Sequence, residues 1–327
     1  MTTSAGQAKD TGRAPEDTGH TESTGHAEFT VPVMSDGDRE ELGTLLTVLG
    51  ADEWPADIDD ARAFYDTWGA PIADDIQVEQ RDGGHLLTPP NAEGALTGLY
   101  LHGGGYVYGS LRSHGHMVGE LARAARCRMF FVDYRRAPEH PHPAALDDTV
   151  AAYRSVLADG LDASDVVLAG DSAGGGLVLA TLLRLRDAGV PLPAAAACVS
   201  PWTDLTGSGE SYRALEDEDP MLSKPVVDLV STSYRAGTAP TDPYVSPLFG
   251  DLAGLPPVLL QVGSREILLS DAERFAEGLR RAGGTGVLEV WPGMVHVWHL
   301  HHARLAKARE AVARLGGWLR ARAAEAR

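Results

Sequence analysis

The sequence predicts an α/β protein with a mostly parallel central sheet, helices on both faces and a helical cap. From about residue 73 onward, short apolar runs alternate with stretches of helical periodicity, the order of a sheet built from strand–helix units. The apolar runs are continuous, as in strands buried on both faces. Two further segments, 29–72 and about 205–236, have helical spacing outside this alternation and predict the cap. At 327 residues and 43% hydrophobic composition, the chain has ample material for a core.

Residues 1–28 are rich in Thr, Gly, Ser, Glu and His, which predicts a disordered arm and disfavours a metal tract at His20 and His26. Apolar residues recur at helical spacing over 38–49 and 58–68. A hairpin signal at Asp82-Gly83-Gly84 separates two short strands, 76–79 and 85–87. Further strands are expected at 96–101, 129–132, 166–169, 195–199, 258–262 and 287–291, and helices at 113–126, 143–157, 177–188, 270–282 and 301–322. Within 73–327, the acidic stretch 216–219 and a helix from Pro220 predict a cap insertion at 205–236.

Composition excludes several classes of function. A formal net charge of −18 disfavours nucleic acid and anionic membranes as partners, because both would repel the protein. No apolar stretch approaches the ~18–20 residues that span a bilayer, and the N-terminus has no apolar signal region. Cys127 and Cys198 lie in apolar runs and fit free thiols better than a disulfide framework. We therefore expect a cytoplasmic protein without membrane insertion.

The most informative stretch is Gly170-Asp171-Ser172-Ala173-Gly174-Gly175. It stands between a predicted strand and a predicted helix, the context in which Gly-x-Ser-x-Gly forms a nucleophile elbow. Glycines at 170 and 174 leave room for the helix to depart at a steep angle. This context predicts that Ser172 is a nucleophile, rather than part of an ordinary glycine-rich helix cap.

Three consecutive glycines follow another predicted strand, in His102-Gly103-Gly104-Gly105-Tyr106. Glycine runs are kept where backbone must approach a group closely. We expect the N–H groups of Gly103 and Gly104, with that of Ala173, to form an oxyanion hole. A phosphate loop is disfavoured because the Gly-Lys-Ser/Thr ending is missing, and a plain turn is the remaining alternative. His102 is expected to brace the loop.

A serine nucleophile needs a general base, and His296 follows the last predicted strand. The acid that orients it is expected after the preceding strand, where Glu266 and Asp271 both stand. Glu266 is preferred, because Asp271 fits the first turn of a helix. The chain order Ser172, Glu266, His296 is then that of an α/β-hydrolase. Metal binding by His299, His301 and His302 is disfavoured, and no cofactor is expected.

The chain resembles the bacterial hormone-sensitive-lipase family of α/β-hydrolase esterases. The resemblance spans about residue 75 to the end and is carried by HGGGY at 102–106, DYRRAPEHP at 133–141, GDSAGG at 170–175, SPWTD at 200–204, DPYVSP at 242–247 and the His296 segment. One position departs from the family pattern, since Glu266-Ile267-Leu268 stands where aspartate followed by Pro-Leu is usual. Glutamate can still accept the imidazole hydrogen bond. The resemblance also implies a tendency to form homodimers.

These observations predict a serine carboxylesterase that hydrolyses short- to medium-chain carboxylic esters through an acyl-enzyme. Lactone hydrolysis and amide or acetyl hydrolysis stay open, and long-chain lipase action is less favoured. A ligand receptor on the same fold is the alternative outside catalysis, disfavoured because His296 is present. Asp171 is expected to support the site, and is the less favoured candidate for the acid. Tyr106, Trp202 and Met221 are candidate substrate-binding residues, with core packing as the alternative.

Overall fold

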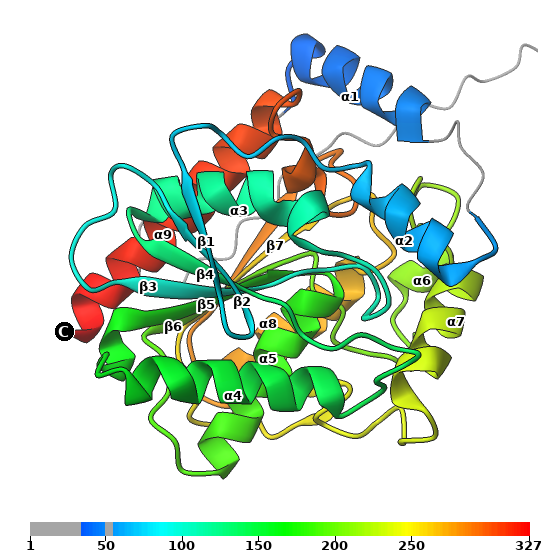
Figure 1. Cartoon of the computed structure of the whole chain (residues 1–327). Helices are drawn as coiled ribbons and strands as arrows, with labels where there is room; N and C mark the ends of the chain where they lie inside the picture. The colour runs from blue at the N-terminus through cyan, green and yellow to red at the C-terminus, as the bar shows by residue number, and fades with distance from the viewer. Residues whose placement is uncertain (1–33, 50–54) are drawn as a thin grey trace, which may run out of the picture.

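The structure is a computed structural model that describes residues 34–49 and 55–327 (Figure 1). The predicted arm at 1–28 lies outside the described residues, as do His20 and His26.

A single eight-stranded sheet forms the centre of the molecule, in the order β1-β2-β4-β3-β5-β6-β7-β8. Strands β1 and β2 form the predicted hairpin, β2 pairs antiparallel with β4, and all other pairs are parallel. The prediction of a mostly parallel sheet is therefore confirmed. The strands are β1 (Gln77–Arg81), β2 (Gly84–Thr88), β3 (Thr97–Leu101), β4 (Arg128–Val132), β5 (Val166–Asp171), β6 (Ala195–Val199), β7 (Val258–Gly263) and β8 (Gly286–Trp291).

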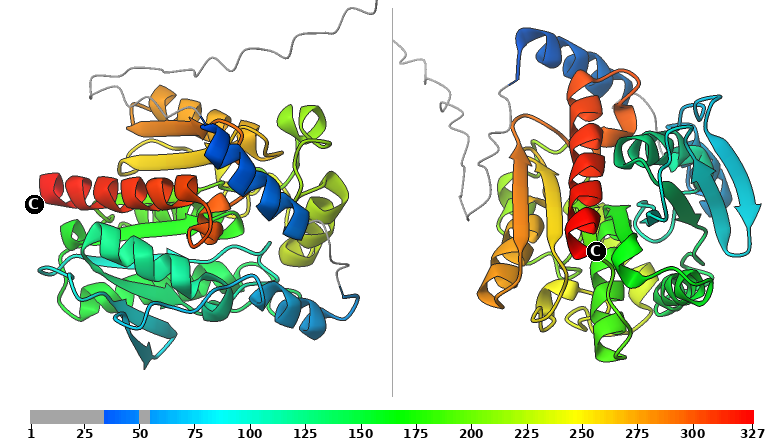
Figure 2. Two further views of the ribbon diagram at one scale, coloured as in Figure 1. Left: turned by 90° about the horizontal axis from the view of Figure 1, so that it is seen from above. Right: turned by 90° about the vertical axis from the view of Figure 1, so that its left-hand side faces the viewer.

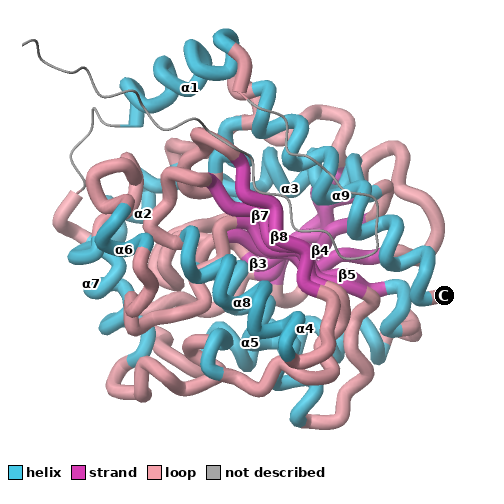
Figure 3. The backbone as a smooth tube through the Cα atoms, turned by 180° about the vertical axis from the view of Figure 1, so that it is seen from behind, coloured by secondary structure: helices cyan, strands magenta, loops and turns pink. Residues whose placement is uncertain are grey.

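Helices cover both faces of the sheet, as predicted (Figures 1 and 3). One apolar cluster joins the sheet to α3 and α9, and another joins its opposite face to α4, α5 and α8. The continuous apolar strands need both layers, because side chains on either face must leave water. The helices are α3 (Leu111–Ala125), α4 (Ala144–Ala158), α5 (Ala173–Asp187), α8 (Leu269–Arg281) and α9 (Ala306–Ala326).

The last helix begins later than predicted. Residues Trp298–His301 form a separate 3₁₀ turn, η3. Leu305 then has extended backbone, with φ −106° and ψ 118°, so α9 starts at Ala306 rather than near residue 301. The apolar residues of this segment lie in a packed loop. Their spacing alone does not distinguish such a loop from a helix.

Both segments predicted as cap contain helices. These are α1 (Asp36–Leu49), α2 (Ile58–Asp66), α6 (Ser211–Ala214) and α7 (Lys224–Arg235). Met34 and Leu42 pack with Met294 and Trp298, so α1 lies over the loop that precedes η3. Figure 2 shows α1 beside the start of α9, where the Glu41 carboxylate accepts from the Ala306 N–H at 2.9 Å. Among the helices that the structure describes, none is both long and apolar enough to cross a bilayer.

Candidate active site

Ser172 lies at the junction of β5 and α5 with a strained backbone, φ 52° and ψ −122°. The neighbouring glycines are needed because the elbow packs directly on backbone. A Cβ on Gly174 would lie 2.0 Å from the Leu101 carbonyl oxygen, and one on Gly170 would lie 2.6 Å from the Gly174 oxygen. A side chain at either position would displace the elbow from the end of β3.

The structure brings Ser172, His296 and Glu266 together from three loops that follow β5, β8 and β7. The Ser172 Oγ lies 2.9 Å from His296 Nε2, and His296 Nδ1 lies 2.9 Å from Glu266 Oε2. Glu266 Oε1 accepts from the Ser200 hydroxyl at 2.8 Å and from the Gly263 N–H at 2.6 Å. The carboxylate is thus held on one oxygen and presents the other to the imidazole, which fixes its tautomer with Nε2 facing the serine.

The charges around His296 favour its protonated form. Burial by itself lowers the pKa of His296, but the hydrogen bond and charge of Glu266, with the charges of Asp219 and Asp171, raise it above its ordinary value. Burial raises the pKa of Glu266, and the contact with His296 opposes that effect. The imidazole is therefore a stronger base than a free histidine, which suits a group that takes a proton from a hydroxyl.

Asp271, the other candidate acid, lies away from the imidazole. Its Oδ2 accepts from the N–H groups of Thr203 and Asp204, each at 2.9 Å. Burial, reinforced by the charge of Asp204, raises the pKa of Asp271 to about 8. This carboxyl group holds the chain after β6 onto α8, so of the two candidates only Glu266 contacts His296.

The prediction that the Gly103 N–H faces the oxyanion is wrong. That N–H donates to Asp171 Oδ1 at 3.0 Å, and a Cβ on Gly103 would lie 2.2 Å from the other carboxylate oxygen. The N–H groups of Gly104, Gly105 and Ala173 donate to no acceptor in the part of the chain that the structure describes. Gly104 and Gly105 have φ 102° and 61°, so the loop turns in a conformation that favours glycine.

Asp171 supports the glycine loop, residues 102–106, by hydrogen bonding. Its carboxylate accepts from the Tyr100 hydroxyl at 2.6 Å and from Gly103, and lies 3.3 Å from His114 Nε2. Although burial opposes ionisation, His114 and Tyr100 hold the pKa of Asp171 below its ordinary value. It does not contact His296 by hydrogen bond, so its place fits the predicted support role and not that of the acid.

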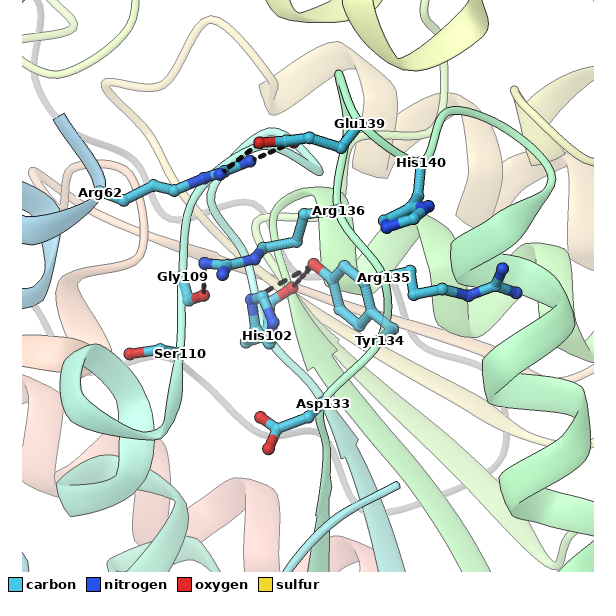
Figure 4. Close-up of a pocket in the computed structure, with 10 residues that line it drawn as sticks. All are labelled: Arg62, His102, Gly109, Ser110, Asp133, Tyr134, Arg135, Arg136, Glu139 and His140. Atoms are coloured by element: carbon cyan, nitrogen blue, oxygen red, sulfur yellow. Dashed lines mark hydrogen bonds and ion pairs between the residues drawn. The ribbon is translucent and has the colours of Figure 1, made fainter. Parts of the chain in front are cut away.

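His102 of the glycine loop also lines a polar cavity of about 480 Å³ (Figure 4). His102 Nδ1 lies 2.8 Å from the Gly103 oxygen, and the His102 ring stacks on Tyr134 with centroids 4.2 Å apart. Arg136 donates to the Gly109 oxygen at 2.8 Å. Ser172 does not line this cavity.

The candidate substrate-binding residues have different surroundings. Tyr106 is buried and stacks on Tyr234 of α7, with centroids 3.6 Å apart. Trp202 is buried, and its backbone N–H donates to the Ser172 oxygen at 3.0 Å. Met221 is half-buried and packs on the cluster that includes Met294. Contact with substrate at these residues stays a prediction.

Sequence spacing gave no sign of Ser200, which links two parts of this site. Its hydroxyl donates to Glu266 and accepts from the Val297 N–H at 3.2 Å. Ser200 and Val297 have φ 46° and 47°, in the left-handed region. A β-branched residue such as Val297 rarely adopts this conformation. The motif SPWTD begins at Ser200, but the motif does not indicate which groups the hydroxyl contacts.

His299 Nε2 lies 2.8 Å from Gln261 Oε1 in the interior. Over residues 34–49 and 55–327, no three His, Cys, Asp or Glu side chains are arranged to hold a metal ion.

Comparison with known proteins gives consistent matches. The model of the alpha/beta hydrolase fold family matches residues 98–300. An acetyl-hydrolase of Streptomyces hygroscopicus is 43% identical over 265 residues, which cover 80% of this chain and 87% of the relative. An esterase of Acinetobacter venetianus is 38% identical over 216 residues, 66% of this chain and 71% of its own. The crystal structure of an esterase from the bacterial hormone-sensitive lipase family superposes with a TM-score of 0.85 at 43% identity, covering 89% of this chain and 99% of that one.

Proposed function

The chain belongs to the α/β-hydrolase family, among the esterases of the bacterial hormone-sensitive-lipase type, and we propose that it hydrolyses short- to medium-chain carboxylic esters through an acyl-enzyme on Ser172. The observation that carries this proposal is the continuous contact from Ser172 Oγ through His296 to Glu266, with 2.9 Å at each step. In this order, the carboxylate orients the imidazole, and the imidazole activates the hydroxyl as a nucleophile.

In the proposed reaction, Ser172 Oγ attacks the ester carbonyl carbon while His296 Nε2 takes the hydroxyl proton. The carbonyl oxygen becomes negative, and the N–H groups of Gly104, Gly105 and Ala173 face it. His296 then gives its proton to the alkoxy oxygen, the C–O bond breaks and the alcohol leaves. Water repeats the same steps on the acyl-enzyme and releases the acid. Glu266 keeps its negative charge throughout and stabilises the imidazolium.

A preference for acetyl groups is the second candidate. The relative from Streptomyces hygroscopicus that is 43% identical is named an acetyl-hydrolase. Rates on acetyl, butyryl and octanoyl p-nitrophenyl esters, an acetylated amine and a lactone would distinguish the two.

The test of the function is Ser172→Ala, assayed with p-nitrophenyl acetate and butyrate. Loss of the nucleophile should lower kcat by about 10⁴-fold or more and abolish the stoichiometric burst of nitrophenol. Ser155→Ala on α4 is the matched control, because Ser155 is exposed and takes no part in the contacts described above. Turnover of Ser172→Ala close to that of the wild type would overturn the proposal.

Two further predictions accompany this function. A cytoplasmic setting is supported by Cys127 and Cys198, which are buried free thiols and suit a reducing compartment. The homodimer stays a prediction, which sedimentation of the full chain would test.

A further inference from the structure

The acidic stretch Glu216–Asp219 of the cap insertion has no role in the reaction as proposed. Its last two carboxylates nevertheless contact the residues on either side of Glu266. Glu218 Oε2 lies 3.4 Å from Arg265 Nε, and Asp219 Oδ2 accepts from the Ile267 N–H at 2.9 Å. The acidic stretch of the cap insertion therefore contacts the residues before and after Glu266, the proposed acid of the Ser172–His296–Glu266 triad.

Asp219 is built into this contact, whereas the rest of the acidic stretch is exposed. Its side chain is buried, and its Oδ1 accepts from the N–H groups of Met221 and Leu222 at 2.9 and 3.0 Å. One carboxylate oxygen thus closes the turn that leads to α7, and the other holds the loop of Glu266. Three N–H donors hold this buried carboxylate in place.

We propose that Asp219 is a positioning residue of the triad, which anchors the Glu266 loop to the cap and sets the basicity of the Glu266–His296 pair. This inference rests on the proposed function. It gives the cap insertion a part in the chemistry, because a movement of the cap would carry a negative charge away from the imidazole.

The charged groups that face His296 are Glu266 on the loop after β7, Asp171 at the end of β5 and Asp219 on the cap insertion. The charge of Asp219 raises the pKa of His296 and also that of Glu266. A negative charge in a buried setting acts strongly, because little water screens it. Without it, His296 should lose its proton at lower pH.

The test compares two uncharged variants, Asp219→Asn and Asp219→Ser, by kcat/KM for p-nitrophenyl acetate against pH. Both side chains keep an oxygen that can accept from the turn at Met221, so at least one variant should fold. The acid limb of the profile should move to lower pH by roughly half a unit or more. On the plateau, kcat should fall about tenfold with little change in KM, because the anchored loop is freed.

Asp217→Asn is the matched control, since it removes the same charge two residues away at an exposed position. Its acid limb should coincide with that of the wild type. An unmoved limb in the folded Asp219 variants, or an equal shift in Asp217→Asn, would overturn the inference while the wild-type burst stands. Absence of a Ser172-dependent burst in the wild type would instead overturn the proposed function, and this inference with it.

Discussion

At the scale of single residues, the site is built from strained backbone held by short polar contacts. Ser172, Ser200 and Val297 all have φ between 46° and 52°. Such conformations cost of order 1–3 kcal/mol each and persist where the surroundings impose them. The Ser200 hydroxyl links two of these positions to the acid, because it accepts from the Val297 N–H and donates to the Glu266 carboxylate. The strained backbone of Val297, next to His296, is thereby linked through hydrogen bonds to the orientation of the Glu266 carboxylate.

Glu266→Ala should lower kcat by about 10³- to 10⁴-fold, because the imidazole loses the group that fixes its tautomer and stabilises its charge. Asp271→Asn should leave kcat within a few-fold of the wild type, since an amide oxygen can still accept from the N–H groups of Thr203 and Asp204. Side-by-side initial rates on p-nitrophenyl butyrate decide. A greater loss at Asp271 would reverse the assignment.

Local context predicted the positions of residues that the structure brings together, and it failed where the partner of a group is distant. The elbow and the order Ser172, Glu266, His296 follow from strand ends, which the apolar runs mark. The role of Gly103 could not be read in the same way, because its N–H is already bonded to a carboxylate 68 positions along the chain. A run of three glycines shows that backbone comes close to something, but not which N–H remains unbonded.

At the scale of elements, Arg62 fastens α2 to the glycine loop. Arg62 Nε donates to the Val107 oxygen at 3.0 Å and Nη2 to the Ala137 oxygen at 3.0 Å. Both terminal nitrogens also contact the Glu139 carboxylate at 2.7 Å (Figure 4). A helix as short as α2 is not stable by itself in water, so these contacts are a condition for its place.

We expect Arg62→Ala to lower Tm and to reduce kcat about three- to tenfold, because the segment after the glycine loop loses its hold on the cap. Arg62→Lys should recover little, since one ammonium cannot reach three acceptors that a planar guanidinium spans. Arg81→Ala is the control, because Arg81 pairs with Glu79 on the exposed strand β1 and such pairs contribute little. Calorimetry and initial rates test this, and equal effects of Arg62→Ala and Arg81→Ala would contradict it.

The elements themselves were largely predictable, and their arrangement was not. Continuous apolar runs gave β4, β5, β6 and β7 within one or two residues, because a strand buried on both faces has no polar face to blur the signal. The order of strands, with β4 between β2 and β3, depends on long-range pairing that periodicity does not encode. Before the late start of α9, Trp298 of η3 packs in one cluster with Leu42 of α1, a contact that periodicity does not encode either.

At the scale of the whole molecule, the interior holds histidines that the proposed reaction does not use. Burial lowers the pKa of His102 and His299 to about 3, and that of His301 and His302 to about 4. In the unfolded chain, the same side chains bind protons at about pH 6.5. Between these values the four histidines hold more protons in the unfolded state than in the folded one, so they make folding less favourable as pH falls.

The free energy of unfolding should therefore decrease from pH 7 to pH 5, before most carboxylates titrate, and denaturant unfolding at both values measures this. His301→Gln should make the decrease smaller by about 1–2 kcal/mol, because His301 is buried and its Nε2 has no hydrogen-bond partner among the described residues. His140→Gln, at an exposed position, is the control and should leave the decrease unchanged. The same pH range contains the acid limb of the proposed reaction, so activity has to be read on protein shown to be folded at each pH. A wild type whose unfolding free energy is equal at pH 7 and pH 5 would show that the buried imidazoles gain protons without unfolding the core.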